Sequence, residues 1–214
     1  MLTMIILLET AAEVSYMDLI MKGGIMMIPL FLLSLIAVFI FFDRFFYLRG
    51  QKRLEPVFFD KLNELIRSGK IDAAINLCES ANCSESRILM KGLQNLGRPI
   101  RDIQDQMEVE GKLEVYNYEG NLYYLGVIAS IAPMLGFIGT IIGVIKIFYN
   151  ISLADNISIS VISGGLYEKL IASGVGLTIG IISYAAYHFL NNRINKLVQN
   201  WEFRCVRFVD LINK

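Results

Sequence analysis

Three long stretches of the chain are almost continuously apolar and set its organisation. They run from about Gly24 to Phe42, from about Leu122 to Phe148 and from about Gly164 to Leu190, and their middles are nearly free of formal charge. A helix rises ~1.5 Å per residue and the hydrocarbon core of a bilayer is about 30 Å thick, so each stretch is long enough to cross a membrane. The pattern therefore predicts three transmembrane helices.

A different pattern separates the first two stretches. From about Leu54 to Glu119 apolar positions recur at helical spacing among mixed charges, which predicts several packed helices. The pattern is interrupted at three loop-like places: Gly69, Asn82–Ser84 and Gly97–Pro99. The last of these helices, from Ile103 to Tyr118, is expected to run directly into the second span, because only single glycines interrupt it. The stretch from Asn191 to Lys214 is expected to continue the third span and to pack on this region.

These elements predict an all-α integral membrane protein with a cytoplasmic helical domain. The expected division is an outer N-terminal segment 1–22, a first span 23–43, a cytoplasmic helical domain 44–121, a second span 122–149, a short outer link 150–163, a third span 164–190 and a cytoplasmic helix 191–214. The N-terminal segment fits either a helix lying on the outer membrane surface or a frayed tail. It lacks the basic start of a cleavable signal, so the first span is expected to act as the insertion signal.

Composition agrees with a membrane protein, and the distribution of charge predicts its orientation in the membrane. Only 19% of the residues are charged, and the mean hydropathy is +0.51. Cations gather after the first span and again after the third, whereas the outer link carries only Asp155. The positive-inside rule then predicts a periplasmic N-terminus and a cytoplasmic C-terminus.

Catalytic and metal-binding motifs are absent from the sequence. It contains no phosphate-binding glycine loop, nucleophile elbow or paired-histidine motif, and it has one histidine. We therefore expect no enzyme activity, no cofactor and no metal. Cys78, Cys83 and Cys205 lie on the predicted reducing side without a CxxC motif, which favours free thiols.

Small and hydroxyl residues form a stripe on each of the last two spans. Gly136, Gly139, Thr140 and Gly143 recur at helical spacing on the second span, and the third carries a similar stripe of Ser173, Gly176 and Gly180. Such stripes permit close helix packing, and this structural role alone would explain them. Thr140 and Ser173 each lie about nine residues from the outer end of their span, so they are expected at one depth. There they could instead line a polar path for a partner carboxylate or water.

Acidic side chains are missing from the middle of every span. If protons move along this path, the titratable group must come from another polypeptide or from Glu168 near the outer mouth. Glu168 has two interpretations, because it can line a proton entrance or form a charge pair with Lys169.

Several segments, in order along nearly the whole chain, resemble the ExbB/TolQ branch of the MotA/TolQ/ExbB proton channel family. They are Gly23-Gly24 with Met27–Pro29 and the closing Asp43-Arg44, the hairpin-like Ser68–Cys78, the second-span motif Ala132–Thr140, and Glu168–Gly176. This resemblance implies a motor subunit of a bacterial inner membrane that converts proton motive force into work on an envelope partner.

The same resemblance implies partners and residue roles. It implies a homopentamer around the helices of two copies of an ExbD- or TolR-like single-span protein, whose membrane Asp carries protons, with a TonB-like protein as a further partner and outer-membrane transport as the work done. Thr140 corresponds to the family threonine that faces that Asp, Ser173 to the third-span threonine and Glu168 to the outer acid. Ser173 keeps the hydroxyl but loses the methyl group, and Gly120 stands where the family often has an arginine. A TolQ-like or gliding-type motor and a non-conducting membrane scaffold are the alternatives.

Overall fold

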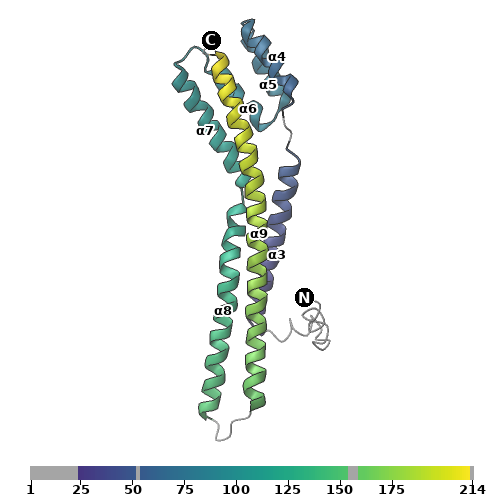
Figure 1. Ribbon diagram of the computed structural model, residues 1–214, viewed down its shortest axis with the longest axis vertical. Helices are drawn as coiled ribbons and strands as arrows, with labels where there is room; N and C mark the ends of the chain where they lie inside the picture. The colour runs from purple at the N-terminus through teal and green to yellow at the C-terminus, as the bar shows by residue number, and fades with distance from the viewer. Residues whose placement is uncertain (1–23, 52–53, 154–158, 213–214) are drawn as a thin grey trace, which may run out of the picture. The chain divides into compact units, whose positions relative to one another are not determined.

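The computed structural model describes residues 24–51, 54–153 and 159–212, and every regular element in these ranges is a helix (Figure 1). In chain order they are α3 (Met27–Arg49), α4 (Pro56–Arg67), α5 (Ile71–Ala81), α6 (Ser84–Gln94), α7 (Ile100–Glu119), α8 (Leu122–Leu153) and α9 (Ile159–Ile212). The expected all-α fold is confirmed. The outer N-terminal segment 1–22 and residues 154–158 of the outer link lie outside the described residues.

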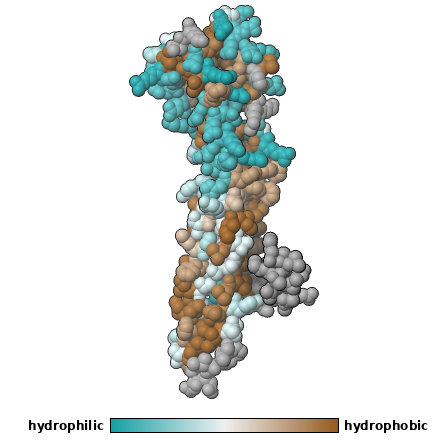
Figure 2. Space-filling view, viewed as in Figure 1, coloured by the Kyte–Doolittle hydropathy of each residue, from teal (hydrophilic) through white to brown (hydrophobic). Residues whose placement is uncertain are grey.

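Within the residues that the structure describes, three helices are long and apolar enough to cross a membrane: α3, α8 and the part of α9 from Ile162 onward. These are the helices expected from the three apolar stretches. Figure 2 shows hydrophobic residues gathered over α8 and the neighbouring part of α9, and hydrophilic residues gathered over α4 to α7. The direction in which the spans cross stays a prediction.

Local sequence signals account for two of the described helix ends. Gly69, with a φ of 71°, separates α4 from α5. Cys83 begins α6 in a capping box with Ser86, whose hydroxyl accepts from the Cys83 N–H at 3.2 Å. α8 continues to Leu153 and α9 starts at Ile159, so both helices extend into the link expected at 150–163. α9 runs unbroken for 54 residues, which confirms that the third span continues as a helix.

The junction between α7 and α8 differs from the sequence prediction. We expected one continuous helix, but α7 ends at Glu119 and α8 begins at Leu122. Gly120 between them has φ 41° and ψ −120°, a conformation outside the helical range. Glycine adopts it readily because it has no Cβ. The expectation of a continuous rod was therefore wrong.

The chain divides into two compact units. The apolar unit comprises Met1–Ile40 and Tyr124–Tyr187, and the polar unit comprises Phe41–Tyr123 and His188–Lys214. The described core of the apolar unit is small, with Met27, Leu30, Ala132 and Ala172 at its centre. In the polar unit, α6 and α7 enclose buried apolar side chains that include Ile88, Leu89, Leu93, Ile103 and Met107.

Candidate functional site

Helices α8 and α9 approach each other closely along the predicted stripes. A Cβ on Gly176 would lie 2.6 Å from the Ala132 carbonyl oxygen and 3.1 Å from the Gly136 Cα. A Cβ on Gly136 would lie 3.0 Å from the Ser173 Cα, and one on Gly180 would lie 3.0 Å from the Ala129 carbonyl oxygen. Only residues without a side chain allow such backbone contact. We call this contact, formed by Ala132, Gly136, Gly176 and Gly180, the glycine seam.

The two other glycines of the second-span stripe face different neighbours. A Cβ on Gly139 would lie 3.2 Å from the Met26 Cγ, just before α3, and 4.0 Å from the Ala172 Cβ on α9. Gly143 lies under the side-chain stem of Lys169, where a Cβ would overlap the stem carbons. The stripe therefore serves contacts with Met26, with the α9 backbone and with one long side chain.

Thr140 and Ser173 lie beside the glycine seam at one level. A Cβ built on Gly139, directly before Thr140, would lie 4.0 Å from the Cβ of Ala172, directly before Ser173. Both hydroxyl residues are half-buried. The Thr140 hydroxyl donates to the Phe137 carbonyl at 2.6 Å, a bond within its own helix that needs no outside partner. A hydroxyl that donates in this way still accepts hydrogen bonds through its oxygen.

Glu168 belongs to α9 by its backbone, but its side chain lies outside the described residues. Its two sequence interpretations therefore stay predictions. The neighbouring Lys169 is half-buried, with its stem across Gly143.

The polar unit contains a buried ionic network that sequence reasoning missed. The Glu114 side chain is 5% exposed and pairs with Arg87, whose Nε and Nη2 donate to its oxygens at 2.5 and 2.8 Å. Arg87 also donates to Ser84 Oγ at 3.1 Å, and Ser84 Oγ lies 3.0 Å from the Tyr118 hydroxyl. That hydroxyl donates to Gln51 Oε1 at 2.9 Å. The network thus connects α6, α7 and the residues after α3.

Burial and hydrogen bonding set the acidity of this network. Burial alone would raise the pKa of Glu114, but hydrogen bonds from Arg87 and Ser84 and the charge of Arg87 outweigh it and hold that pKa below its ordinary value. Burial raises the pKa of Tyr118 to about 12. Glu114 is thus a charged, paired carboxylate at neutral pH, which suits a structural bond better than a proton carrier.

A second buried acid, Glu85, joins α6 to the far part of α9. Its Oε2 accepts from Arg204 Nη1 at 2.6 Å and from the Leu54 N–H at 3.3 Å. The same Arg204 nitrogen donates to the Leu54 carbonyl at 3.0 Å, and the Arg204 guanidinium lies over the Phe59 ring. The expected packing of the C-terminal helix on the middle region is confirmed by this pair and by the Tyr118–Trp201 ring contact, with centroids 5.1 Å apart.

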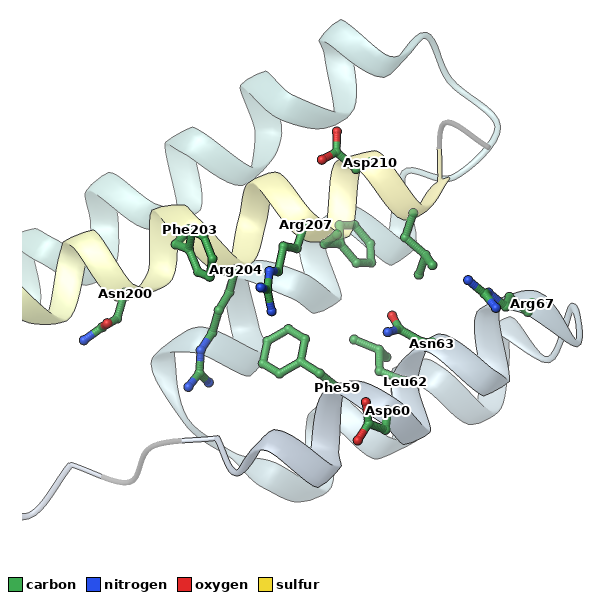
Figure 3. Close-up of a pocket in the computed structure, with 12 residues that line it drawn as sticks. Phe59, Asp60, Leu62, Asn63, Arg67, Asn200, Phe203, Arg204, Arg207 and Asp210 are labelled. Carbon is green, nitrogen blue, oxygen red and sulfur yellow. The ribbon is translucent and has the colours of Figure 1, made fainter.

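A groove of about 540 Å³ opens between α4 and the end of α9 (Figure 3). Arg207 points from α9 into it toward Phe59, whereas Asp210 points away. The groove lies wholly within the polar unit and includes neither Thr140 nor Ser173. Across the described parts of the chain, no three or more His, Cys, Asp or Glu side chains gather as a metal site would require.

Comparisons with known proteins match this chain to one family. Residues 80–203, more than half of the chain, match the MotA/TolQ/ExbB proton channel family. A protein of Methanothermobacter thermautotrophicus, named "Putative biopolymer transport protein ExbB homolog", is 26% identical over 204 residues. The match covers 89% of this chain and 71% of the relative. ExbB-like 3 of Synechocystis is 28% identical, covering 75% and 78%. TolQ of Haemophilus influenzae is 28% identical, covering 48% and 45%.

Proposed function

The chain belongs to the ExbB/TolQ branch of the MotA/TolQ/ExbB proton channel family, and on this premise we propose that it is the proton-channel subunit of an ExbB–ExbD-type complex. In this proposal the complex sits in a bacterial inner membrane, with the N-terminus of the subunit periplasmic and its C-terminus cytoplasmic. It uses proton motive force to energise outer-membrane transport through a TonB-like protein. Five copies of the subunit surround two copies of an ExbD- or TolR-like single-span partner.

One observation carries the proposal: Thr140 and Ser173 flank one level of a glycine seam between two helices long enough to span a membrane. A hydroxyl can accept a hydrogen bond from a protonated carboxylic acid and, after rotation, donate one to the carboxylate. The pair is therefore suited to a partner acid that alternates between the two states. Because no acid lies in the middle of any span of this chain, the partner supplies the titrating group.

The remaining site residues take supporting roles. Glu168, near the outer end of the third span, attracts protons at the entrance of the path. The five glycines act in helix packing: Gly136, Gly176 and Gly180 let the α8 and α9 backbones approach, whereas Gly139 leaves room for Met26 and Gly143 for the Lys169 stem. The subunit performs no covalent chemistry and needs no cofactor of its own.

The test is proton uptake by vesicles that contain the subunit together with its partner. We expect Thr140→Ala to lower uptake severely while the complex still assembles, and Ser173→Ala to lower it less. Thr178→Ala is the matched control, because Thr178 makes the same kind of intrahelical bond, to the Gly174 carbonyl at 2.8 Å, on an exposed face of α9. If Thr140→Ala and Ser173→Ala both keep full uptake, the hydroxyl path is excluded.

The alternatives predict different results in the same assay. A non-conducting scaffold would show no uptake in the wild type although the complex assembles. A TolQ-like or gliding-type motor would conduct protons, but its co-purifying envelope protein would not be of the TonB type. Identification of the single-span protein that co-purifies with the chain therefore separates these roles.

A further inference from the structure

Arg44, near the end of α3, has a mostly buried side chain that makes contacts on several sides. Its side chain is 15% exposed, and its Nε lies 3.1 Å from the Asp43 carboxylate. Its guanidinium lies over the Tyr47 ring, 5.2 Å from the centroid. Its Nη1 donates to the Asn117 carbonyl in the last turn of α7 at 3.2 Å. These contacts link the end of α3 to the end of α7.

The Arg44 guanidinium occupies the space that a side chain at residue 120 would need. A Cβ on Gly120 would lie 2.6 Å from Arg44 Nη2, and nearer still to Cζ and Nη1. Gly120 also has a φ of 41°, which disfavours other residues. The glycine is thus required twice, once for its backbone conformation and once for the arginine.

Electrostatics at the end of α7 favour the same arrangement. The last carbonyls of a helix carry partial negative charge and have no partner within the helix, so a cation placed there is favourable. α7 has no basic residue in its own last turn. Arg44 supplies that cation from α3, at the point where the chain leaves the helix.

We propose that Arg44 is a positioning residue that, with Asn117 and Gly120, forms an arginine clasp fixing the break between α7 and α8. The clasp fixes the residue at which α8 begins, which is the buried Leu122. Thr140 lies on this same helix. The link from clasp to proton conduction rests on the proposed function, whereas the clasp itself does not.

The first experiment compares two arginines at the end of the same helix. Arg44→Ala removes a charge-assisted hydrogen bond, and we expect proton uptake per assembled complex to fall about tenfold. Arg49→Ala removes an equal charge from an exposed position at the same helix end and should leave uptake unchanged. Arg44→Lys keeps the charge without the planar guanidinium and should be intermediate. Equal loss in Arg44→Ala and Arg49→Ala would overturn the proposal, because a general interfacial charge would then explain both.

The second experiment approaches the clasp from Gly120. Gly120→Ala should displace the guanidinium and reduce uptake, whereas Gly69→Ala, which also has a positive φ but open space around it, should not. The double variant Arg44→Ala/Gly120→Ala should lose no more than the worse single variant, since both changes break one interaction. Losses that multiply in the double variant would overturn the clasp.

A readout that does not depend on conduction separates the two proposals. Amide hydrogen exchange of residues 117–123 should be about tenfold faster in Arg44→Ala than in the wild type or Arg49→Ala, because a bond of this kind contributes roughly 1.4 kcal/mol or more. If the wild type conducts no protons but exchange still depends on Arg44, only the proposed function fails. If conduction is confirmed and exchange is unaffected, only the clasp fails.

Discussion

Each of the two units of the molecule is held together internally by a different kind of contact. In the apolar unit, α8 meets α9 backbone to backbone at Gly136 and Gly176, and large apolar side chains such as Phe137 and Ile181 are more than half exposed. In the polar unit, buried acids are paired with arginines, as in Glu114–Arg87 and Glu85–Arg204, within apolar surroundings.

The difference follows from the solvent that each unit is suited to. Lipid offers helices no hydrophobic driving force for association, so close packing of small residues must supply it. Water drives apolar side chains inward and makes a buried charge costly unless it is paired. Steric changes should therefore damage the apolar unit most, and charge changes the polar unit.

The largest effect is expected from filling the glycine seam. Gly176→Leu places a side chain against the Ala132 carbonyl and the Gly136 backbone, which cannot move aside as a flexible side chain can. Overpacking of a core costs about 1–3 kcal/mol when side chains can adjust, so this change should exceed that range and prevent recovery of a monodisperse protein in detergent. Size-exclusion chromatography measures the recovery.

Gly174 provides the matched control on the same helix. It is exposed, and a Cβ there would meet no atom within 4 Å. Gly174→Leu should therefore be recovered like the wild type. Equal damage by both substitutions would mean that helix propensity, and not the seam, explains the loss.

An intermediate effect is expected from breaking the ion pair of the polar unit. Arg87→Met leaves Glu114 buried without its cation, which costs about 3 kcal/mol, the lower end for a buried pair because Arg87 remains partly exposed. Thermal unfolding in detergent measures the change. Lys112→Met removes the cation of the exposed Glu108–Lys112 pair and should leave the unfolding temperature close to that of the wild type. Equal falls in the unfolding temperature of Arg87→Met and Lys112→Met would contradict a stabilising role specific to the buried pair.

The smallest effect is expected from acid. The pKa of Glu114 in the folded protein is below its ordinary value of 4.5, so its stabilisation is present above that value and is lost as pH falls through the folded pKa. The unfolding temperature of the wild type should therefore drop more steeply below about pH 4.5 than that of Arg87→Met/Glu114→Leu, which lacks the pair. Parallel curves would contradict a role for Glu114 in acid stability.

Much of the helical layout could be predicted from the sequence because its signals are local. Each span is a continuous apolar stretch, and Gly69 and Asn82 mark helix ends because both residue types tolerate a positive φ. The small-residue stripes also predicted close helix packing on α8 and on α9, and the structure shows that the two stripes contact each other. The partner of each glycine could not be predicted, because Gly139 faces Met26 while Gly136 faces Ser173.

The features that were missed depend on residues far apart in the chain. The break at Gly120 coincides with Arg44, which bonds a carbonyl 73 positions away. Glu85 meets Arg204 across 119 positions. Glu114 did carry a usable signal, because it lies in one helical stripe with the buried residues Ile103, Met107 and Tyr118. An acid on an apolar stripe indicates a buried partner.

Pro133, inside α8, has a mechanical consequence. A proline cannot donate to the carbonyl four residues earlier, here that of Ala129, and Gly180 approaches the same carbonyl without a side chain. α8 thus lacks one elastic restraint less than two turns before Thr140. We expect α8 to bend most easily at Pro133, so that the helical segment carrying Thr140 can tilt as a rigid unit relative to the segment before Pro133.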